Sequence, residues 1–303
     1  MKNTFTIAVI AAGVFCFCAP SRAWWPEGHG ILSEAAVRAL PDETPRFFRR
    51  QAKAVAHYSF DPDVAKNRAA PHASNAEFSE HFFDWELIAP VLGDESFPIT
   101  RYEFLKLCYD NDLKPNEVGL LPFAVAEWTE RLTIDFAQYR RWPKNKAIEN
   151  KCLVTAGTLA HYAEDLCQPL HVTIHHDGRA NADGSSPKTG IHARMDSLIE
   201  VLKLSPRELA EGQIILSVGE LLPAILLEIH NSRRHIETVY ALENSLPHDG
   251  KMPAHVAEGV LPLAHERARE ATRFTAALFL TAWRRSENVE LPVWLKREEN
   301  PAH

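Results

Sequence analysis

Apolar residues recur along most of the chain at the three- and four-residue spacing of a helix that buries one side. Charged residues fill the positions between them, as expected for helices packed against a core. Proline follows several of these stretches, at Pro41, Pro143 and Pro169, where it prevents the helix from continuing. The pattern predicts helices over 28–40, 45–57, 118–141, 146–167, 206–244 and 253–286.

The sequence lacks the signals of a β-sheet and of a division into several domains. No block of alternating apolar and polar residues occurs, no internal repeat is evident, and no Gly/Ser/Pro linker separates the helical stretches. With 303 residues and 46% apolar side chains, the chain is long enough to bury a large core without disulfide bonds. We therefore predict an all-α fold, a single-domain bundle of many helices.

The first 23 residues have the organisation of a secretory signal peptide. Lys2 supplies the positive start, an apolar run of 15 residues covers 5–19, and Ser21-Arg22-Ala23 offers a small-x-small cleavage site. The apolar run is shorter than the roughly 20 residues that a membrane span needs. We expect cleavage after Ala23, export to a periplasm or the medium, and a mature domain over 24–303.

Cysteine usage argues against a disulfide scaffold. Cys16 and Cys18 leave with the signal peptide, and the bulky residues before them suit a lipid-attachment site poorly. Cys108, Cys152 and Cys167 remain, an odd number, so at least one thiol is unpaired. The last two fall on one predicted helix, about 22 Å apart along its axis, too far to be bridged.

Composition excludes several classes and leaves one feature to explain. The content of apolar and charged residues is that of a globular protein, not of a disordered, collagen-like or basic nucleic-acid coat protein. The formal charge of −7 becomes −9 once the signal peptide removes Lys2 and Arg22. Histidine, however, accounts for 15 residues, which is high enough to suggest a specific use.

The clearest motif is His161-Tyr-Ala-Glu-Asp165-Leu-Cys-Gln-Pro169-Leu-His171. At positions i and i+4 of a helix, His161 and Asp165 lie on one face, one turn apart. Pro169 then ends the helix and lets His171 turn back toward that face. Three side chains of the type that binds metals therefore converge within eleven residues.

Four shorter motifs carry the same residue types. Taken singly, each also has a purely structural interpretation, as a solvated helix face, a core histidine, a turn or an exposed terminus. Together they offer more imidazole and carboxylate groups than the three or four ligands that one zinc ion needs, which indicates more than one metal. The motifs are His192-Ala-Arg-Met-Asp196, His81-Phe82-Phe83-Asp84, Asp61-Pro62-Asp63 and Trp24-Trp25-Pro26-Glu27-Gly28-His29.

With these motifs, the chain resembles the trinuclear-zinc phosphodiesterases, which include single-strand-specific nucleases and bacterial zinc-dependent phospholipases C. The resemblance implies an all-α fold and three zinc ions per chain. It also implies that cleavage frees the Trp24 amine to bind zinc, and that Asp63 orients or deprotonates the attacking water. The implied ligands are Trp24, His29 and Asp165 for one zinc, Asp63, His81, His161 and Asp165 for a second, and His171, His192 and Asp196 for the third. Asp61 is the alternative to Asp63.

Two spacings favour the nuclease branch of this superfamily. Trp24 lies five residues before His29, and 21 residues separate His171 from His192. The resemblance implies hydrolysis of single-stranded DNA or RNA, and possible action on 3′-nucleotides, with Phe82 and Asp84 contacting a base. A phospholipase C acting on phospholipid is the alternative, and a non-catalytic zinc-binding protein is a third hypothesis. No obligate protein partner is evident.

One loop leaves the choice of substrate open. The segment 175–190 matches neither branch closely, and Gly190 stands where the nucleases usually have Asn. His175 and His176 in this loop are interpreted as polar loop residues rather than ligands.

Overall fold

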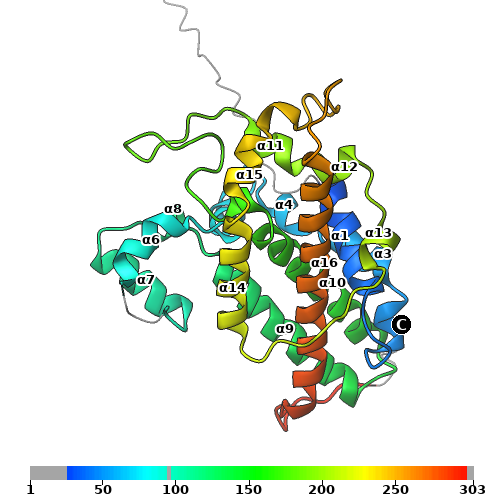
Figure 1. Ribbon diagram of the computed structural model, residues 1–303. Coiled ribbons are helices and arrows are strands. Elements are labelled where there is room, and N and C mark those ends of the chain that lie inside the picture. The colour runs from blue at the N-terminus through cyan, green and yellow to red at the C-terminus, as the bar shows by residue number, and fades with distance from the viewer. Residues whose placement is uncertain (1–25, 94–96, 299–303) are drawn as a thin grey trace, which may run out of the picture.

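The computed structural model describes residues 26–93 and 97–298, and within them the fold is all-α (Figure 1). The only β pairing in this part of the chain is an isolated bridge between His248 and Lys251. The predicted all-α class is therefore confirmed. No helix among the described residues is long and apolar enough to cross a membrane. The predicted signal peptide, 1–23, and the predicted ligand Trp24 lie outside the described residues.

The described helices differ widely in length, and the longest ones form the centre of the molecule. The α-helices are α1 (Pro26–Arg38), α2 (Arg46–Arg49), α3 (Ala52–Tyr58), α4 (Asp61–Ala65), α5 (Pro71–Glu77), α6 (Trp85–Leu92), α7 (Arg101–Asp110), α8 (Pro115–Val118), α9 (Leu121–Arg141), α10 (Lys146–Leu166), α11 (Ile191–Asp196), α12 (Leu198–Val201), α13 (Pro206–Ala210), α14 (Leu221–Arg233), α15 (Ile236–Ala241) and α16 (Val260–Arg285). Four 3-10 turns accompany them: η1 (Phe78–His81), η2 (Pro169–His171), η3 (Glu243–Ser245) and η4 (Ser286–Asn288).

The predicted helices are confirmed where apolar periodicity is uninterrupted. The stretches 28–40, 118–141 and 146–167 correspond to α1, α9 and α10 within a few residues. The prediction of one helix over 206–244 is wrong, because residues 211–220 contain no helix and separate α13 from α14. Gly212 begins this break with a φ of +69°, in the left-handed region that glycine favours. The stretch 45–57 is likewise divided into α2 and α3.

Helix α10 lies at the centre of the bundle, behind α16 in Figure 1 and against α1, α3 and α9. Its residues from Thr155 to Leu166 are all buried, so neighbours cover it on every side. At one side of this core, the rings of Phe48, Phe136 and Phe279 meet edge to face, with centroids 5.2 and 5.4 Å apart. A helix enclosed in this way has a fixed position, and so do the polar groups at its end.

Gly157 allows α10 to approach the end of α3 closely. A Cβ atom at this position would lie 2.5 Å from the Cβ of Tyr58 and 2.9 Å from the backbone nitrogen of Ser59. Because no side chain intervenes, the Ser59 carbonyl reaches the ring of His161, one helical turn further along α10. The small residue thus determines a contact of the candidate site.

A second close approach holds the segment that carries His81. The backbone nitrogens of Asp84 and Leu120 donate hydrogen bonds to the carbonyls of Val118 and Ser79, both at 2.7 Å. Between these bonds, Gly119 has a φ of +94°, and a Cβ there would lie 2.1 Å from the Phe82 carbonyl oxygen. Residues 79–84 are therefore clamped by 118–121, which fixes the direction of the His81 side chain.

Cysteines do not stabilise this part of the fold by cross-linking. Cys108, Cys152 and Cys167 are all buried and all free. Burial raises the pKa of the Cys108 thiol to about 11, so it stays protonated at neutral pH. These residues serve as small apolar side chains in the core.

Charged side chains are buried between α14 and α16. Glu228 and Arg267 expose only 2% and 4% of their side chains, and Arg267 Nη1 lies 3.9 Å from Glu228 Oε1. Neither of these atoms has a hydrogen-bond partner among the described residues. Burial, together with the neighbouring Glu270, raises the pKa of Glu228 to about 8. At neutral pH, the folded protein therefore keeps this carboxyl protonated in most molecules.

We predict that Glu228→Gln makes thermal stability less dependent on pH. Because an unfolded glutamate has a pKa of about 4.3, the folded state holds a proton between about pH 4.5 and 8 that the unfolded state releases. Wild-type stability therefore falls as the pH rises through this range, and glutamine removes that loss. The measurement is thermal unfolding followed by circular dichroism at pH 5, 6, 7 and 8. Between pH 5 and pH 8, the Tm of the variant should decrease by a few degrees less than that of the wild type.

The matched control is Glu220→Gln, at the exposed start of the same helix. It should keep the wild-type dependence of Tm on pH. Equal slopes for wild type and Glu228→Gln would contradict the assignment of a buried, protonated Glu228.

Candidate metal centre

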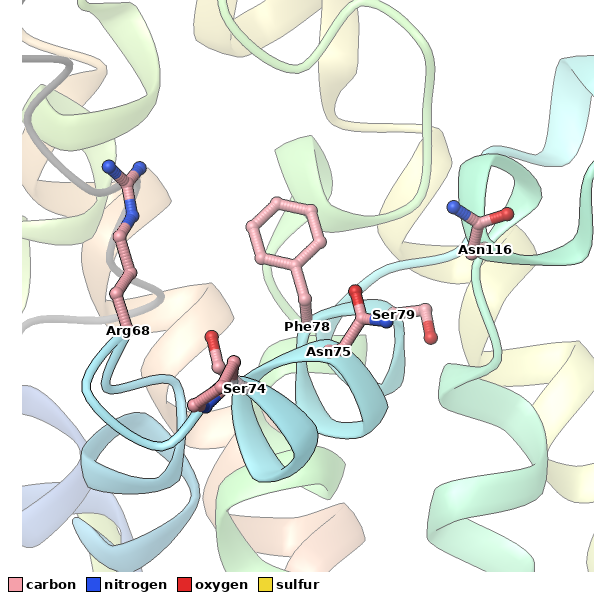
Figure 2. Close-up of a pocket in the computed structure, with 7 residues that line it drawn as sticks. Arg68, Ser74, Asn75, Phe78, Ser79 and Asn116 are labelled. Atoms are coloured by element: carbon pink, nitrogen blue, oxygen red, sulfur yellow. The ribbon is translucent and has the colours of Figure 1, made fainter.

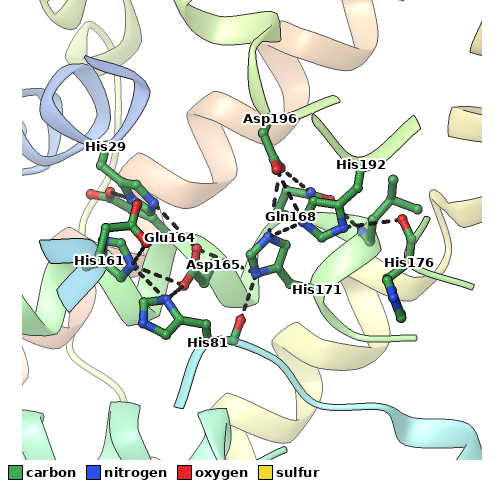
Figure 3. Close-up of polar contacts among 12 residues, drawn as sticks. His29, His81, His161, Glu164, Asp165, Gln168, His171, His176, His192 and Asp196 are labelled. Atoms are coloured by element: carbon green, nitrogen blue, oxygen red, sulfur yellow. Dashed lines mark hydrogen bonds and ion pairs between the residues drawn. The ribbon is translucent and has the colours of Figure 1, made fainter. Parts of the chain in front are cut away.

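Histidine and aspartate side chains from six separate elements meet at the C-terminal end of α10 (Figure 3). Helix α10 contributes His161 and Asp165, because their i, i+4 spacing places both on one face. The remaining residues come from α1 (His29), α4 (Asp63), η1 (His81), η2 (His171) and α11 (His192 and Asp196). Side chains that are spread from residue 29 to residue 196 in the sequence thus meet at one place in the fold.

Ligand atoms of these residues form three groups, each compact enough to hold a metal ion. Within every group, one atom from each residue lies within 4.8 Å of the others. The groups are His29, His161 and Asp165; Asp63, His81 and His161; and His171, His192 and Asp196. His161 belongs to two of them, so the first two groups adjoin.

Eight of the nine ligands expected from the sequence are therefore brought together. The ninth, Trp24, lies outside the described residues, two positions before α1 begins at Pro26. Of the two aspartates of α4, Asp63 faces the cluster, with Oδ1 4.0 Å from His161 Nε2. Asp61 is exposed and belongs to none of the groups. The geometry thus favours Asp63 over Asp61.

Backbone carbonyls orient three of the histidine rings in the same way. The Nδ1 atoms of His161, His171 and His192 lie 2.8, 2.7 and 3.2 Å from the carbonyl oxygens of residues 59, 81 and 176. Because a carbonyl oxygen only accepts hydrogen bonds, each Nδ1 carries the proton and donates it. In the neutral ring, Nε2 then presents a lone pair to the cluster, which is the usual arrangement for a metal-binding histidine.

His29 is oriented by a carboxylate instead. Its Nδ1 donates to Glu164 Oε2 at 2.7 Å, and the hydroxyl of Ser33 donates to the other oxygen of Glu164, also at 2.7 Å. Helices α1 and α10 are joined by these buried bonds. His29 Nε2 points the other way and lies 3.4 Å from Asp165 Oδ1.

The second group surrounds His161 and His81. His161 Nε2 lies 2.9 Å from His81 Nδ1, and both lie near Asp165 Oδ2, at 3.3 and 3.0 Å. Asp63 completes the group, and the Lys66 ammonium forms an ion pair with its Oδ1 at 2.5 Å.

The third group lies on the other side of Asp165, as Figure 3 shows. His171 Nε2 and His192 Nε2 are 3.0 Å apart, and His192 Nε2 is 3.2 Å from Asp196 Oδ2. The side-chain amide of Gln168 donates to the other oxygen of Asp196 at 2.6 Å. Gln168 also accepts a hydrogen bond from the backbone nitrogen of Leu170, which fixes its orientation.

The nitrogen and oxygen atoms of the three groups are better arranged to bind metal ions than to form hydrogen bonds with one another. When the rings of His171 and His192 are both neutral with Nδ1 protonated, their Nε2 lone pairs at 3.0 Å repel each other, whereas a cation between them would bind both. Buried carboxylates likewise need a compensating charge. Six buried polar atoms of the cluster have no hydrogen bond among the described residues, although one of them, Asp63 Oδ1, is ion-paired with Lys66: His29 Nε2, both oxygens of Asp63, His81 Nε2, Asp165 Oδ1 and Asp196 Oδ2. They are half of all such buried side-chain atoms in the described chain.

Protonation follows the balance between burial and neighbouring charges. Burial lowers the pKa of His29, but Asp165 and Glu164 outweigh it and raise this pKa to about 10. Burial and the charge of His29 lower the pKa of His161 to about 4, so this ring is neutral at pH 7. His161 and His171 outweigh the effect of burial on Asp165 and hold its pKa well below the usual range. His161 and Asp165 thus have the ionisation states that metal binding requires, whereas His29 holds a proton that a bound metal would displace.

The two residues expected to contact substrate follow His81 in the sequence, and Asp84 lies near His171 of the third group. Phe82 is half-buried, and its ring meets that of Phe78 edge-on, with centroids 5.9 Å apart. Asp84 is 8% exposed, and burial, with repulsion from Glu86, raises its pKa to about 8. Its carboxyl is therefore mostly protonated at neutral pH and offers both a donor and an acceptor.

Sequence reasoning assigned no role to Glu164, Gln168 and Lys66, which orient or pair with the candidate ligands. Glu164 and Gln168 stand inside the His161–His171 motif, but only the packing of α1 and α11 shows what they contact. Residues 175 and 176 lie in turns outside the helices, and neither belongs to the three groups. The carbonyl of His176 nevertheless orients His192.

No protein-family model matches the chain, and no curated protein matches it. The resemblance to trinuclear-zinc phosphodiesterases therefore stays a prediction from motifs.

We predict that zinc stabilises the protein and that Glu164→Gln weakens this effect. A metal that binds only the folded state adds about 2.7 kcal/mol when its free concentration is 100-fold above Kd. Loss of the carboxylate that orients His29 should weaken zinc binding by about 10- to 100-fold. Zinc titrations of chelator-treated protein, followed by Tm, would measure both effects.

Glu149→Gln, at the opposite end of α10, is the matched control and should respond to zinc like the wild type. A Tm that does not change with zinc in the wild-type protein would contradict the metal centre.

Proposed function

We propose that the protein is an exported zinc-dependent phosphodiesterase that hydrolyses single-stranded DNA or RNA, with action on 3′-nucleotides as a related activity. The observation that carries this proposal is the convergence of the three groups around Asp165, where six buried side-chain atoms lack a hydrogen-bond partner among the described residues. Eight of the residues that the resemblance implies as ligands meet there, and only the third group has the implied membership unchanged. The site thus supports a centre of several metals rather than one isolated ion.

Bound zinc ions would lower the pKa of a water molecule and neutralise charge on a phosphoryl group. The residues around them would supply position and proton transfer. His29 and Asp165 would hold one zinc together with Trp24. Asp63, His81, His161 and Asp165 would hold the second, and His171, His192 and Asp196 the third.

Asp63 is suited to orient the attacking water and to accept its proton. Although burial raises its pKa, His161 and Lys66 outweigh this effect and hold the carboxyl ionised. It is the one carboxylate of the three groups that is not fully enclosed, with 11% of its side chain exposed. Substrate can therefore approach from the Asp63 side.

Net charge does not oppose a phosphodiester substrate. Three zinc ions would add six positive charges to the three aspartates of the groups, which reverses the sign of the site in an acidic protein. Phe82 and Asp84, on the segment of His81, would contact a base by stacking and by hydrogen bonds.

The difference at Gly190 is compatible with the proposal. Gly190 precedes α11 with a φ of +81°, in the left-handed region. Glycine and asparagine are the residues that adopt this conformation most readily, so an asparagine at this position would meet the same backbone requirement as this glycine.

We predict that Asp63→Asn and Asp61→Asn differ strongly in activity, although the two residues are only two positions apart. Asp63→Asn removes the ionised carboxylate and should lower kcat/KM on single-stranded DNA by about 100-fold or more. Asp61→Asn changes an exposed residue two positions away and should retain wild-type activity. The measurement uses correctly processed, zinc-loaded protein that starts at Trp24.

The same preparation should be assayed in parallel on single-stranded DNA, single-stranded RNA and phosphatidylcholine vesicles. Hydrolysis of nucleic acid is expected. Hydrolysis of lipid alone would favour the phospholipase C alternative. Failure to hydrolyse any of them with zinc bound would leave a non-catalytic zinc-binding protein.

A further inference from the structure

A polar pocket lies on the segment of chain that joins two of the candidate ligands, Asp63 and His81 (Figure 2). Its volume is about 330 Å³, which is within the range of small-molecule sites. Arg68, Ser74, Asn75, Phe78, Ser79 and Asn116 line it, together with Pro71. None of these residues belongs to the three metal groups.

The pocket adjoins the candidate metal centre through η1. Ser79 and His81 share this single turn, and the ring of Phe78 contacts that of Phe82. Glu77, directly before Phe78, has its Oε1 3.3 Å from His81 Nε2. A molecule in the pocket would therefore be close to a substrate bound at the second group.

The loop that carries Arg68 is held in place by its own hydrogen bonds. The Ser74 hydroxyl donates to the Lys66 carbonyl at 2.9 Å, and Asn67 accepts hydrogen bonds from the backbone nitrogens of Ala69 and Ala70. Figure 2 shows the side chains of Arg68 and Phe78 on the same side of this segment. The guanidinium group of Arg68 and the ring of Phe78 thus line the same pocket.

The charge of Arg68 is available to a ligand. Arg68 is exposed and makes no ion pair or hydrogen bond among the described residues. The nearby acids are engaged elsewhere, because Glu77 accepts a hydrogen bond from the Tyr162 hydroxyl and Glu80 pairs with Arg101. The pocket therefore attracts an anionic group such as a phosphate.

The other lining groups suit a nucleobase. Phe78 leaves 58% of its surface exposed, which is unusual for a phenylalanine and offers a face for stacking. Asn75 and Asn116 carry amides that both donate and accept hydrogen bonds. Ser79, which is only 4% exposed, adds a hydroxyl that can donate and accept hydrogen bonds. Five of the seven lining residues are polar, which disfavours an acyl chain.

We propose that this pocket binds a nucleotide that flanks the scissile phosphodiester of single-stranded nucleic acid, with Phe78 stacking on its base and Arg68 contacting its phosphate. This inference rests on the proposed function and extends it, because it assigns oligonucleotides rather than mononucleotides as the preferred substrates.

The first test measures kcat/KM of the zinc-loaded protein on oligothymidylates of two to eight nucleotides. Stacking on an aromatic side chain corresponds to a factor of about 5 to 150, so kcat/KM should increase by that factor at the length that first fills the pocket. Phe78→Ala should remove this increase, and Phe78→Trp should retain it. The control Tyr102→Ala removes a side chain that is 82% exposed on α7 and should keep the increase.

The second test addresses Arg68, the pocket residue that we propose contacts a phosphate. Each phosphate contact contributes about 0.7 to the slope of log affinity against log salt concentration for single strands. Arg68→Ala should weaken oligonucleotide binding and make this slope shallower by about that amount, whereas Arg68→Lys should restore most of it. A merely structural role of Arg68 would not change the slope.

The outcomes distinguish the two proposals. Cleavage of oligonucleotides without a length-dependent increase, or with one that persists in Phe78→Ala, overturns the pocket assignment and leaves the nuclease proposal standing. If no oligonucleotide of any length is cleaved while bis(4-nitrophenyl) phosphate is hydrolysed, both proposals fail.

Discussion

The buried carboxylate of Asp165 is the group on which the rest of the site depends. Its Oδ1 lies 3.4 Å from His29 and 3.6 Å from His171, and its Oδ2 lies 3.0 Å from His81 and 3.3 Å from His161. One fully buried side chain thus connects four imidazoles that come from four elements. Such a charge is costly to bury unless other charges compensate it, which is why its neighbours are fixed so closely.

The position of Asp165 follows from the packing of α10. Because this helix is enclosed on every side, its C-terminal end cannot move without disturbing the core. Gly157 brings α10 onto the end of α3, and Glu164 joins it to α1. The same contacts that stabilise the bundle therefore orient the rings of His161 and His29. Fold and candidate site share one set of interactions.

Sequence periodicity predicted the elements whose structure is determined locally. Helix α10 agrees with the predicted stretch 146–167, because apolar spacing is regular there and Pro169 marks its end. The single helix predicted over 206–244 was wrong. Ile214 and Leu216, in the break between α13 and α14, are apolar but 78% and 71% exposed. Periodicity reports which residues are apolar, whereas only the tertiary packing determines which of them are buried.

The same distinction applies to the site. The pairs His161–Asp165 and His192–Asp196 could be predicted because i, i+4 spacing alone places them together. The contacts of Glu164 with His29 could not, because they depend on how α1 packs against α10. The pocket beside Phe78 was not predicted for the same reason, since Asn116 reaches it from α8, far along the chain.

Anomalous diffraction at the zinc absorption edge tests the central claim most directly. Crystals of zinc-loaded mature protein should give three peaks, one beside each group, at about 2.0–2.2 Å from the histidine nitrogens and aspartate oxygens. The absence of peaks at the groups, or peaks only at surface positions, would contradict the account.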